Sequence, residues 1–251
     1  MITALAGIDH ELVECDPALA DTAAFCERSG YELADSANTI VVVGDAVDAA
    51  SAVERLHQLE RRWSRFLPDS EVSALNRSGG IPMVVSPDTT RLVETMVEAW
   101  HLTDGAYDPT LLRSIVEAGY RTSRTDPQRH TEVRPEIEFQ GRQAEIRIDR
   151  AAGVVQLPVG TAIDAGGIGK GLAADIVVEE LLAAGADGVL VEVGGDLAVS
   201  GRSPDGDGWN IAVAESPDSQ SPDAMIRLSA GGVATSTTRR RRWVTDAGER
   251  H

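Results

Sequence analysis

Residues 161–175 read Thr-Ala-Ile-Asp-Ala-Gly-Gly-Ile-Gly-Lys-Gly-Leu-Ala-Ala-Asp, and the rest of the chain can be organised around them. A short apolar run leads to Asp164, and four glycines then surround Lys170. Residues 170–185 continue with apolar side chains at helical spacing and end at a glycine, which predicts a helix. Glycine allows positive φ and close approach of a ligand to the backbone, and a helix N-terminus favours an anion. The stretch therefore predicts an anion-binding loop at the start of a helix.

Lys170 makes this prediction more specific. It is the only lysine of the chain, and a cation in the first turn of a helix opposes the helix dipole. A residue that local electrostatics disfavour is a candidate for function, although a lysine beside a turn is more often simply solvated. The neighbouring glycines, the helix start and Asp164 together favour a phosphate site.

Two common phosphate-binding loops do not fit the spacing. A Walker A loop has a glycine six residues before its lysine and a serine or threonine after it, whereas Asp164 and Gly171 stand there. A dinucleotide fingerprint that starts at Gly167 requires a third glycine where Leu172 stands. The loop is therefore predicted to bind phosphate in another way.

Composition sets the broad class of protein. The chain has 251 residues, with 42% hydrophobic and 25% charged residues, which is ordinary for a globular protein of one large or two small domains. The net charge of −17 argues against general binding to nucleic acid or acidic lipid. A phosphorylated ligand needs a local positive pocket, which Lys170, backbone amides and a divalent cation could supply.

The start of the chain and its cysteines predict a cytoplasmic protein. Residues 1–10 contain no basic region followed by an apolar one, and no apolar run of the chain reaches membrane-spanning length. Cys15 and Cys26 are the only cysteines, and their spacing matches neither a metal site nor a redox motif. We expect no disulfide framework and no membrane span.

The first half of the chain is predicted to combine helices with short strands. Ser86-Pro87-Asp88 has the preferred order of cap, proline and acid for a helix start. Pro68 ends an earlier helix, after which Asp69 or Ser70 can cap another. Asp108 precedes a proline and is open to a purely structural interpretation, as the cap of a helix at 110–118. The predicted elements are helices at 17–28, 46–66 and from 87 onward, strands at 39–43 and 81–85, and a surface loop at 120–136.

The second half is predicted to be mostly strands. Gly141 suggests the turn of a weakly alternating hairpin at 136–148, and Gly194-Gly195-Asp196 can be a turn or a bulge. The four arginines at 239–242 alternate between the faces of a predicted strand, so a solvated edge is favoured over a nucleic-acid patch. Residues 245–250 read as a hairpin turn for which we expect no returning strand. The predicted strands are 154–157, 161–163, 189–193, 197–200, 209–214, 225–228 and 231–244.

Four segments, taken in order, resemble the ApbE family of FAD:protein FMN transferases. Residues 63–76 are similar to the family's aromatic-Ser-x-aromatic-x-Pro-Asp-Ser-Glu-x-Ser-x-Leu-Asn stretch, and residues 105–109 to its Gly-Ala-aromatic-Asp-Pro. Residues 164–171 resemble its Asp-x-Gly-Gly-Ile-x-Lys-Gly, and residues 194–196 its Gly-Gly-Asp. Residues 234–236 also look like its Ala-Thr-Ser strand. The resemblance covers about residues 38–251, and the ordered set is a strong signal although each motif alone is weak.

The resemblance implies a reaction. Members bind FAD and a divalent cation, usually Mg²⁺, and transfer the FMN moiety to a threonine or serine hydroxyl of a target flavoprotein, releasing AMP. Such a transfer requires charge neutralisation at the diphosphate and a positioned hydroxyl. Two alternatives remain open: an FAD pyrophosphatase that yields FMN and AMP without a protein acceptor, and a non-catalytic FAD-binding protein. Family members can be exported, so the resemblance is compatible with other compartments.

The resemblance also implies site residues. Phe66 is expected to contact the flavin or its linker, and the Gly167 carbonyl is expected to bind the metal. His251 is the candidate catalytic residue, as the first residue of the family's His-x-Ile-Asp-Pro segment or the residue before it. The other residues expected around FAD are Ala106, Tyr107, Asp108, Asp164 and Lys170, with Gly195 and Asp196 near the cofactor.

The chain departs from the family pattern at its C-terminal end. Members continue through the histidine segment to an Asp-x-x-x-Thr motif whose side chains bind the metal, and a site with one carbonyl is expected to hold Mg²⁺ poorly. We expect residues 1–37 to be an N-terminal extension and residues 38–251 to be a C-terminally incomplete ApbE-like domain. The expected fold is α+β and T-fold-like, with a mostly antiparallel sheet, packed helices, and the ligand in a cleft among the four motifs.

Overall fold

The computed structural model describes residues 38–44, 49–123, 126–204, 206, 208–213, 224–236, 243–245 and 248–250. The predicted extension 1–37 with its helix and both cysteines, the arginine run 239–242 and His251 lie outside these residues. The chain divides into two compact units. We call Met1–Glu54 with Ala173–Thr235 the sheet unit, and Arg55–Leu172 with Ser236–His251 the motif unit. Each is described by itself.

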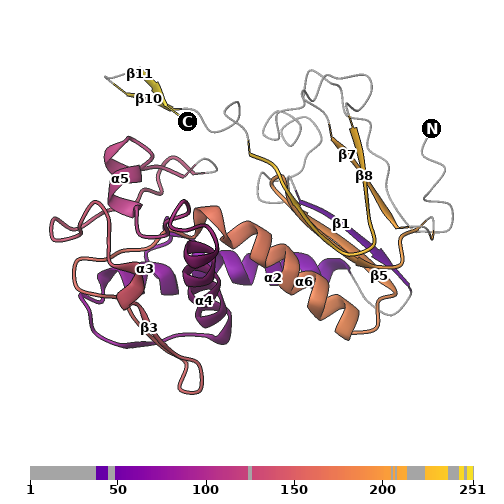
Figure 1. The fold of residues 1–251 in the computed structure, drawn as a ribbon, viewed down its shortest axis with the longest axis horizontal. Coiled ribbons are helices and arrows are strands. Elements are labelled where there is room, and N and C mark those ends of the chain that lie inside the picture. Colours follow the sequence, from indigo (N-terminus) through magenta and orange to yellow (C-terminus); the bar gives the residue numbers. More distant parts are fainter. Residues whose placement is uncertain are drawn as a thin grey trace. The chain divides into compact units, whose positions relative to one another are not determined.

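The sheet unit contains an antiparallel sheet whose strand order is β1-β5-β6-β9. Strands β1 and β5 lie side by side, with Val41 opposite Leu190, and Leu190 is in turn opposite Val199 of β6 (Figure 1). The bounds are β1 Asn38–Val43, β5 Gly188–Val193, β6 Asp196–Gly201 and β9 Gly231–Ala234. The predicted strands at 39–43, 189–193 and 197–200 are therefore confirmed.

A tight turn joins β5 to β6. Val193 pairs with Asp196, and the two residues between them have positive φ, 56° at Gly194 and 93° at Gly195. A two-residue hairpin of this kind requires positive φ at both positions, which explains the glycine pair. Glu192 accepts a hydrogen bond from the Gly195 N–H at 2.9 Å. The segment is a turn, and the alternative of a bulge is excluded.

A second antiparallel pair in the sheet unit is formed by β7 Trp209–Val213 and β8 Ala224–Leu228. Trp209 and Ile211 form a buried cluster with Val199, against which Leu190 and Leu228 pack. The apolar side chains of these strands thus stabilise the unit by the removal of apolar surface from water. Both strands occur where the sequence predicted them.

Two helices of the motif unit, α3 and α4, begin where the sequence predicts caps. Ser70 accepts a hydrogen bond from the Ser73 N–H at the start of one helix, and Ser86 accepts one from the Thr89 N–H at the start of another. Trp63, at the end of the helix before Pro68, donates from Nε1 to the Thr89 hydroxyl. The helices are α2 Ala49–Trp63, α3 Glu71–Arg77, α4 Pro87–Leu102 and α5 Leu112–Glu117.

The glycine-rich stretch also folds as predicted. A 3₁₀ turn, η4 Ala165–Gly167, leads into α6 Gly169–Ala183, and Lys170 lies in its first turn. The helix is followed by Gly185 at φ 105°, a conformation that glycine adopts without strain. None of the helices in the described part of the chain is both long enough and apolar enough to cross a membrane.

Strands are short in the motif unit. They form a three-stranded antiparallel sheet in the order β2-β4-β3 and a separate pair, β10 with β11. The bounds are β2 Met83–Val84, β3 Arg147–Asp149, β4 Val154–Gln156, β10 Trp243–Thr245 and β11 Gly248–Arg250. The fold is α+β with antiparallel sheets, as predicted.

Four local predictions are wrong. Residues 136–146 form no strands and carry only the 3₁₀ turn η3 Gln143–Glu145, because Gly141 packs against Thr161 instead of turning a hairpin. Residues 161–163 form no strand, since their backbone bonds to a side chain described below. A returning strand does follow residue 245, and Trp243 pairs with Arg250. The strand predicted at 231–244 is not continuous, because β9 ends at Ala234 and residues 235–236 form no strand. Residues 237–242 lie outside the described residues, and β10 begins at Trp243.

Candidate functional site

The polar residues of the stretch 63–76 mostly hold the scaffold together. Glu71 accepts hydrogen bonds from the Ser86 N–H at 3.0 Å and the Ser86 hydroxyl at 2.6 Å, and also from the Thr89 hydroxyl. Asn76 donates from Nδ2 to the Ile163 carbonyl and accepts from the Ile163 N–H, both at 2.8 Å. This amide bridge connects α3 to the residue before Asp164, so the first motif fixes the third in place.

The segment 105–109 is an irregular turn that presents Tyr107 and Asp108. Asp104 has φ 49°, an uncommon value outside glycine, and Gly105 has φ 80° and donates to the Trp100 carbonyl at 2.9 Å. Such a left-handed pair ends α4 abruptly and turns the chain back. Ala106 is exposed, whereas Tyr107 is half-buried.

Asp108 is held by four hydrogen bonds. Its Oδ1 accepts from the Thr110 N–H at 2.8 Å and the Thr110 hydroxyl at 2.7 Å, and its Oδ2 accepts from the Gln140 amide at 2.9 Å and from Gln143. Burial raises the pKa of Asp108, but these bonds outweigh burial and leave the pKa below its usual value. The interpretation of Asp108 as the cap of α5 is wrong, because that helix begins after Leu111 without a side-chain cap.

Asp164 caps the glycine turn and links it to the segment around Tyr107. Its Oδ1 accepts from the Gly166 N–H at 3.3 Å, and its own N–H donates to the Pro109 carbonyl at 2.9 Å. Gly167 packs against the Tyr107 ring so closely that a Cβ at this position would lie 2.7 Å from the ring Cε2. The second and third motifs are therefore in direct contact.

Tyr107 is the most perturbed group of this region. Its hydroxyl oxygen is buried and makes no hydrogen bond within the described part of the chain. Burial raises the pKa of Tyr107 far above its usual value, and the negative charges of Asp164 and Asp108 raise it further. Tyr107 therefore stays a neutral phenol at ordinary pH, with a donor available to a ligand.

Arg65 is a functional candidate that the sequence prediction missed. Its side chain is 3% exposed, and its Nε lies 3.3 Å from Asp164 Oδ1. The guanidinium stacks 4.2 Å from the centroid of the Phe66 ring. Arg65 lies inside a predicted motif between two aromatic residues, and that position was the only available signal. The contact joins the first motif to the third.

The motif unit thus brings Phe66, Tyr107, Asp108, Asp164 and Gly167 into one continuous cluster through Arg65. Lys170 lies in the first turn of α6, three residues beyond Gly167, and is half-buried. The remaining candidates, Gly195 and Asp196 in the sheet unit and His251 outside the described residues, are not placed in this cluster.

A cavity of about 470 Å³ lies beside Phe66 in the motif unit. Leu112, Ile137 and Ala162, which belong to one buried apolar cluster, also line it. Basic side chains line it together with one glutamate. The ionisable residues other than Arg65 are Arg77, Arg129, His130, Glu132 and Arg134. An apolar lining with several cations suits a flat apolar ligand that carries negative charge.

Comparison with known proteins assigns the chain to a family. A sequence model of the ApbE family matches residues 34–251. The chain belongs to the ApbE family. The FAD:protein FMN transferase of Haemophilus influenzae is 27% identical over 72% of this chain and 55% of its own length, and that of Vibrio cholerae is 27% identical over 77% and 59%. The chain therefore spans little more than half the length of these curated relatives.

Solved ApbE structures have the same fold. The crystal structure of the ApbE protein from Thermotoga maritima superposes with a TM-score of 0.71 at 25% identity, covering 87% of this chain and 72% of that one. The apo form of the flavinyl transferase ApbE from Pseudomonas stutzeri gives a TM-score of 0.64 at 26% identity, covering 85% and 69%. The predicted resemblance and the predicted fold class are confirmed.

The described residues of this ApbE chain do not by themselves form a metal site. Across the ranges given above, no three histidine, cysteine, aspartate or glutamate side chains gather in a way that could hold a metal ion. Mg²⁺ prefers octahedral coordination by oxygen, and the predicted ligand, the Gly167 carbonyl, would supply only one oxygen. A Mg²⁺ ion at this position needs further ligands from water, the substrate or residues outside the described ranges.

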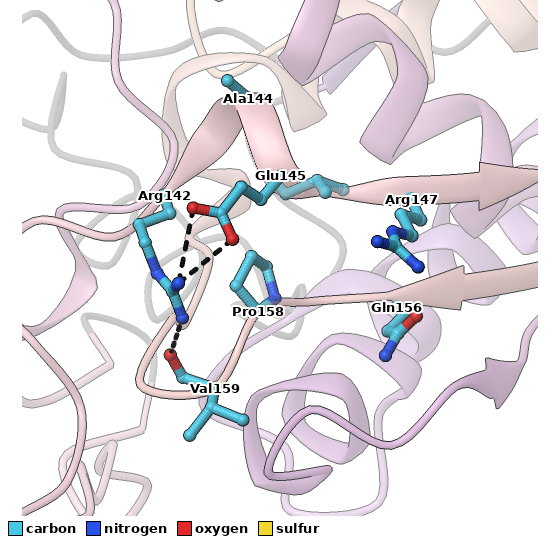
Figure 2. A pocket seen from close by; sticks show the side chains of 8 residues that line it. Arg142, Ala144, Glu145, Arg147, Gln156, Pro158 and Val159 are labelled. Carbon is cyan, nitrogen blue, oxygen red and sulfur yellow. Dashed lines mark hydrogen bonds and ion pairs between the residues drawn. The ribbon is translucent and has the colours of Figure 1, made fainter.

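A second cavity of the ApbE fold, of about 400 Å³, contains none of the predicted site residues (Figure 2). Arg142 crosses one side of it and donates to Glu145 and to the Val159 carbonyl, each at 3.0 Å. Gln143, the next residue of the same turn, donates to Asp108. The arginine clamp therefore steadies the turn that holds Asp108, which is a structural role.

Proposed function

We propose that this chain is the FAD-binding part of an FAD:protein FMN transferase. The target hydroxyl oxygen attacks the phosphorus of the FMN half of FAD, the bond between the two phosphates breaks, and AMP leaves with the other phosphate. The hydroxyl proton is lost and no water is consumed. The relatives named FAD:protein FMN transferase support this reaction, and the observation that carries it here is the contact of Tyr107 with Gly167.

That contact matters because it assembles one site from separate motifs. The glycine turn offers backbone N–H groups near a helix start, and the Tyr107 hydroxyl has no partner among the described residues. A buried donor without a partner costs about 1–3 kcal/mol, which a bound ligand relieves. We propose that Tyr107, Ala106 and Asp108 line the FAD site and that Asp164 contacts FAD.

The charge pattern agrees with a diphosphate ligand. Because the chain carries a net charge of −17, a diphosphate needs local cations, and Lys170 beside the glycine turn is one. A bound Mg²⁺ would neutralise further charge at the diphosphate, and we propose the Gly167 carbonyl as one of its ligands. Phe66 is proposed to contact the flavin or its linker, because it borders the cavity that has an apolar lining and a basic rim.

Three candidates have weaker support. Gly195 and Asp196 are proposed near the cofactor from their motif alone, with Gly195 in the turn of the sheet unit. His251 is proposed as a catalytic residue from its sequence position alone. The target flavoprotein supplies the threonine or serine acceptor.

The experiment mixes the chain with FAD, Mg²⁺ and a peptide that carries an acceptor threonine, and analyses the peptide by mass spectrometry. We expect an adduct whose mass is that of FMN less one water, and one AMP released per adduct. The matched control replaces the acceptor threonine with valine, which removes the hydroxyl and keeps the side-chain shape.

The other outcomes separate the alternatives. Release of FMN and AMP in equal amounts with no peptide present would identify an FAD pyrophosphatase. FAD binding that does not depend on Mg²⁺ and yields no product would identify a non-catalytic FAD-binding protein. Absence of FAD binding with and without Mg²⁺ would reject the proposed function.

A further inference from the structure

Arg65 has a different partner at each of its three guanidinium nitrogens. Nε pairs with Asp164 Oδ1 at 3.3 Å, Nη1 donates to the Thr131 hydroxyl at 2.7 Å, and Nη2 donates to the Tyr120 carbonyl at 2.9 Å. The planar guanidinium carries its donors in a fixed fork, so three partners fix both its position and its rotation. A buried cation with this many contacts is unable to shift without losing several of them.

Two aromatic rings also contact this guanidinium. Its central carbon lies 4.2 Å from the Phe66 centroid and 4.7 Å from the Tyr120 centroid. Tyr120 is itself stacked on Trp243 of β10, with ring centroids 5.4 Å apart and planes 22° from parallel. Trp243 donates from Nε1 to the Ala118 carbonyl at 2.6 Å. The contacts around Arg65 thus connect the first motif, through Tyr120 and Trp243, to the C-terminal strand pair.

The fixed position of Arg65 constrains the carboxylate of Asp164. Its Oδ1 forms an ion pair with Arg65 Nε and accepts a hydrogen bond from the Gly166 N–H, whereas its Oδ2 has no hydrogen-bond partner in the described part of the chain. With Oδ1 occupied by these two contacts, Oδ2 is the oxygen available to a ligand. A carboxylate oxygen accepts hydrogen bonds only, and it repels phosphate.

We propose that Arg65 is a positioning residue that holds Oδ1 of Asp164, so that Oδ2 accepts a hydrogen bond from a hydroxyl or N–H group of FAD. This inference rests on the proposed function, because it takes FAD to be the ligand. The parts of the glycine turn then bind different parts of FAD. The backbone amides and Lys170 bind the diphosphate, and Asp164 binds a donor group elsewhere on the same ligand. Arg65 also offsets a negative charge that would otherwise oppose an anionic ligand.

The test measures FAD affinity in variants of Arg65 and Asp164 by titration with Mg²⁺ present. R65K keeps the charge but has one nitrogen in place of three, and R65Q removes the charge. We expect the Kd of FAD to rise about tenfold or more in each, the loss typical of a hydrogen-bonded charged group. D164N keeps a neutral acceptor oxygen and removes the charge that Arg65 holds, and a rise of similar size is expected.

The double variant R65Q/D164N distinguishes positioning from a general structural role. If Arg65 acts through Asp164, the double variant binds FAD no more weakly than the worse of the two single variants. The matched control is R113K. Arg113 also lies over an aromatic ring, 4.5 Å from the Phe139 centroid, and donates to the Ile137 carbonyl, but it has no part in the Asp164 contact. We expect its Kd to equal that of the parent chain.

Three other results would overturn either the positioning role of Arg65 or the proposed function. Losses that multiply in the double variant would overturn the positioning role while leaving the proposed function intact. Failure of both R65K and R65Q to fold, judged by circular dichroism, would assign Arg65 to the scaffold and overturn the proposal. Absence of FAD binding by the parent chain would reject the proposed function itself, and this inference with it.

Discussion

Replacing Asn76 with alanine removes both halves of the amide bridge to Ile163. Ile163 is 0% exposed, so its N–H and carbonyl lose their bonding partner in a place that water does not reach. Each orphaned buried group costs about 1–3 kcal/mol, which gives a loss of about 2–6 kcal/mol in the free energy of unfolding. With a urea m-value of about 3 kcal/mol/M, the midpoint of unfolding falls by about 0.7–2 M.

The assay pairs urea unfolding with hydrogen exchange at the Ile163 amide. In N76A we expect this amide to lose its protection, because the Asn76 oxygen was its acceptor. N76D keeps that oxygen and replaces the donor, so the Ile163 amide stays protected while the carbonyl loses its partner. The exposed Asn210, whose oxygen accepts from Arg227 at 3.0 Å, provides the matched control, and N210A is expected to change stability by less than about 0.5 kcal/mol.

One result would refute this reasoning. If N76A unfolds at the same urea concentration as N210A, or if its Ile163 amide remains as protected as in the parent chain, the bridge does not hold the approach to Asp164. The FAD affinity of N76A adds a functional measurement, since loosening of Ile163 also moves Asp164.

Three further perturbations test the remaining contacts. G167A places a Cβ 2.7 Å from the Tyr107 ring, so we expect FAD affinity to fall about tenfold. In G171A the new Cβ meets nothing within 4 Å, so we expect this variant to stabilise α6 by about 0.5–1 kcal/mol. Thermal melts and FAD titration check both variants. Y107F removes a buried hydroxyl without a partner, so we expect stability to stay level or rise by about 1 kcal/mol while FAD binds more weakly, and a loss of stability would contradict this. Burial raises the pKa of Asp88, but hydrogen bonds and charge from Arg55 and Arg62 outweigh burial and hold this pKa below its usual value. Because the folded pKa is the lower one, Asp88 stabilises the fold at pH above about 4 and loses this effect as the pH falls below it, so the Tm difference between the parent and D88N should narrow in acid.

The starts of α3 and α4 and the turn between β5 and β6 could be predicted because their causes are local. Ser70 and Ser86 cap helices through bonds to residues three positions away, and Gly194 and Gly195 provide the positive φ that a two-residue turn needs. Such features are encoded within a few neighbouring residues. The family resemblance then predicted the right family and the right fold class.

The rest depends on contacts between residues far apart in the chain. Arg65 meets Thr131 across 66 residues and Asn76 meets Ile163 across 87, and no periodicity in the sequence signals either pair. The strand predicted at 161–163 failed for this reason, because a side chain took the place of a neighbouring strand. The hairpin predicted at 136–148 failed because weak alternation is a poor guide where burial is set by distant residues.

The bonds of Glu71 and Asn76 affect how the Pro-Asp-Ser-Glu-x-Ser-x-Leu-Asn signature is read. Glu71 and Asn76 join helices to a neighbouring backbone, so a stable fold needs them whether or not the chain carries out chemistry. A genome search keyed on this signature gathers every chain that keeps the framework, whether it still modifies a protein or only holds a nucleotide. Sorting active from inactive paralogues requires letters proposed to contact the ligand, such as Tyr107 and Asp164 beside the glycine turn.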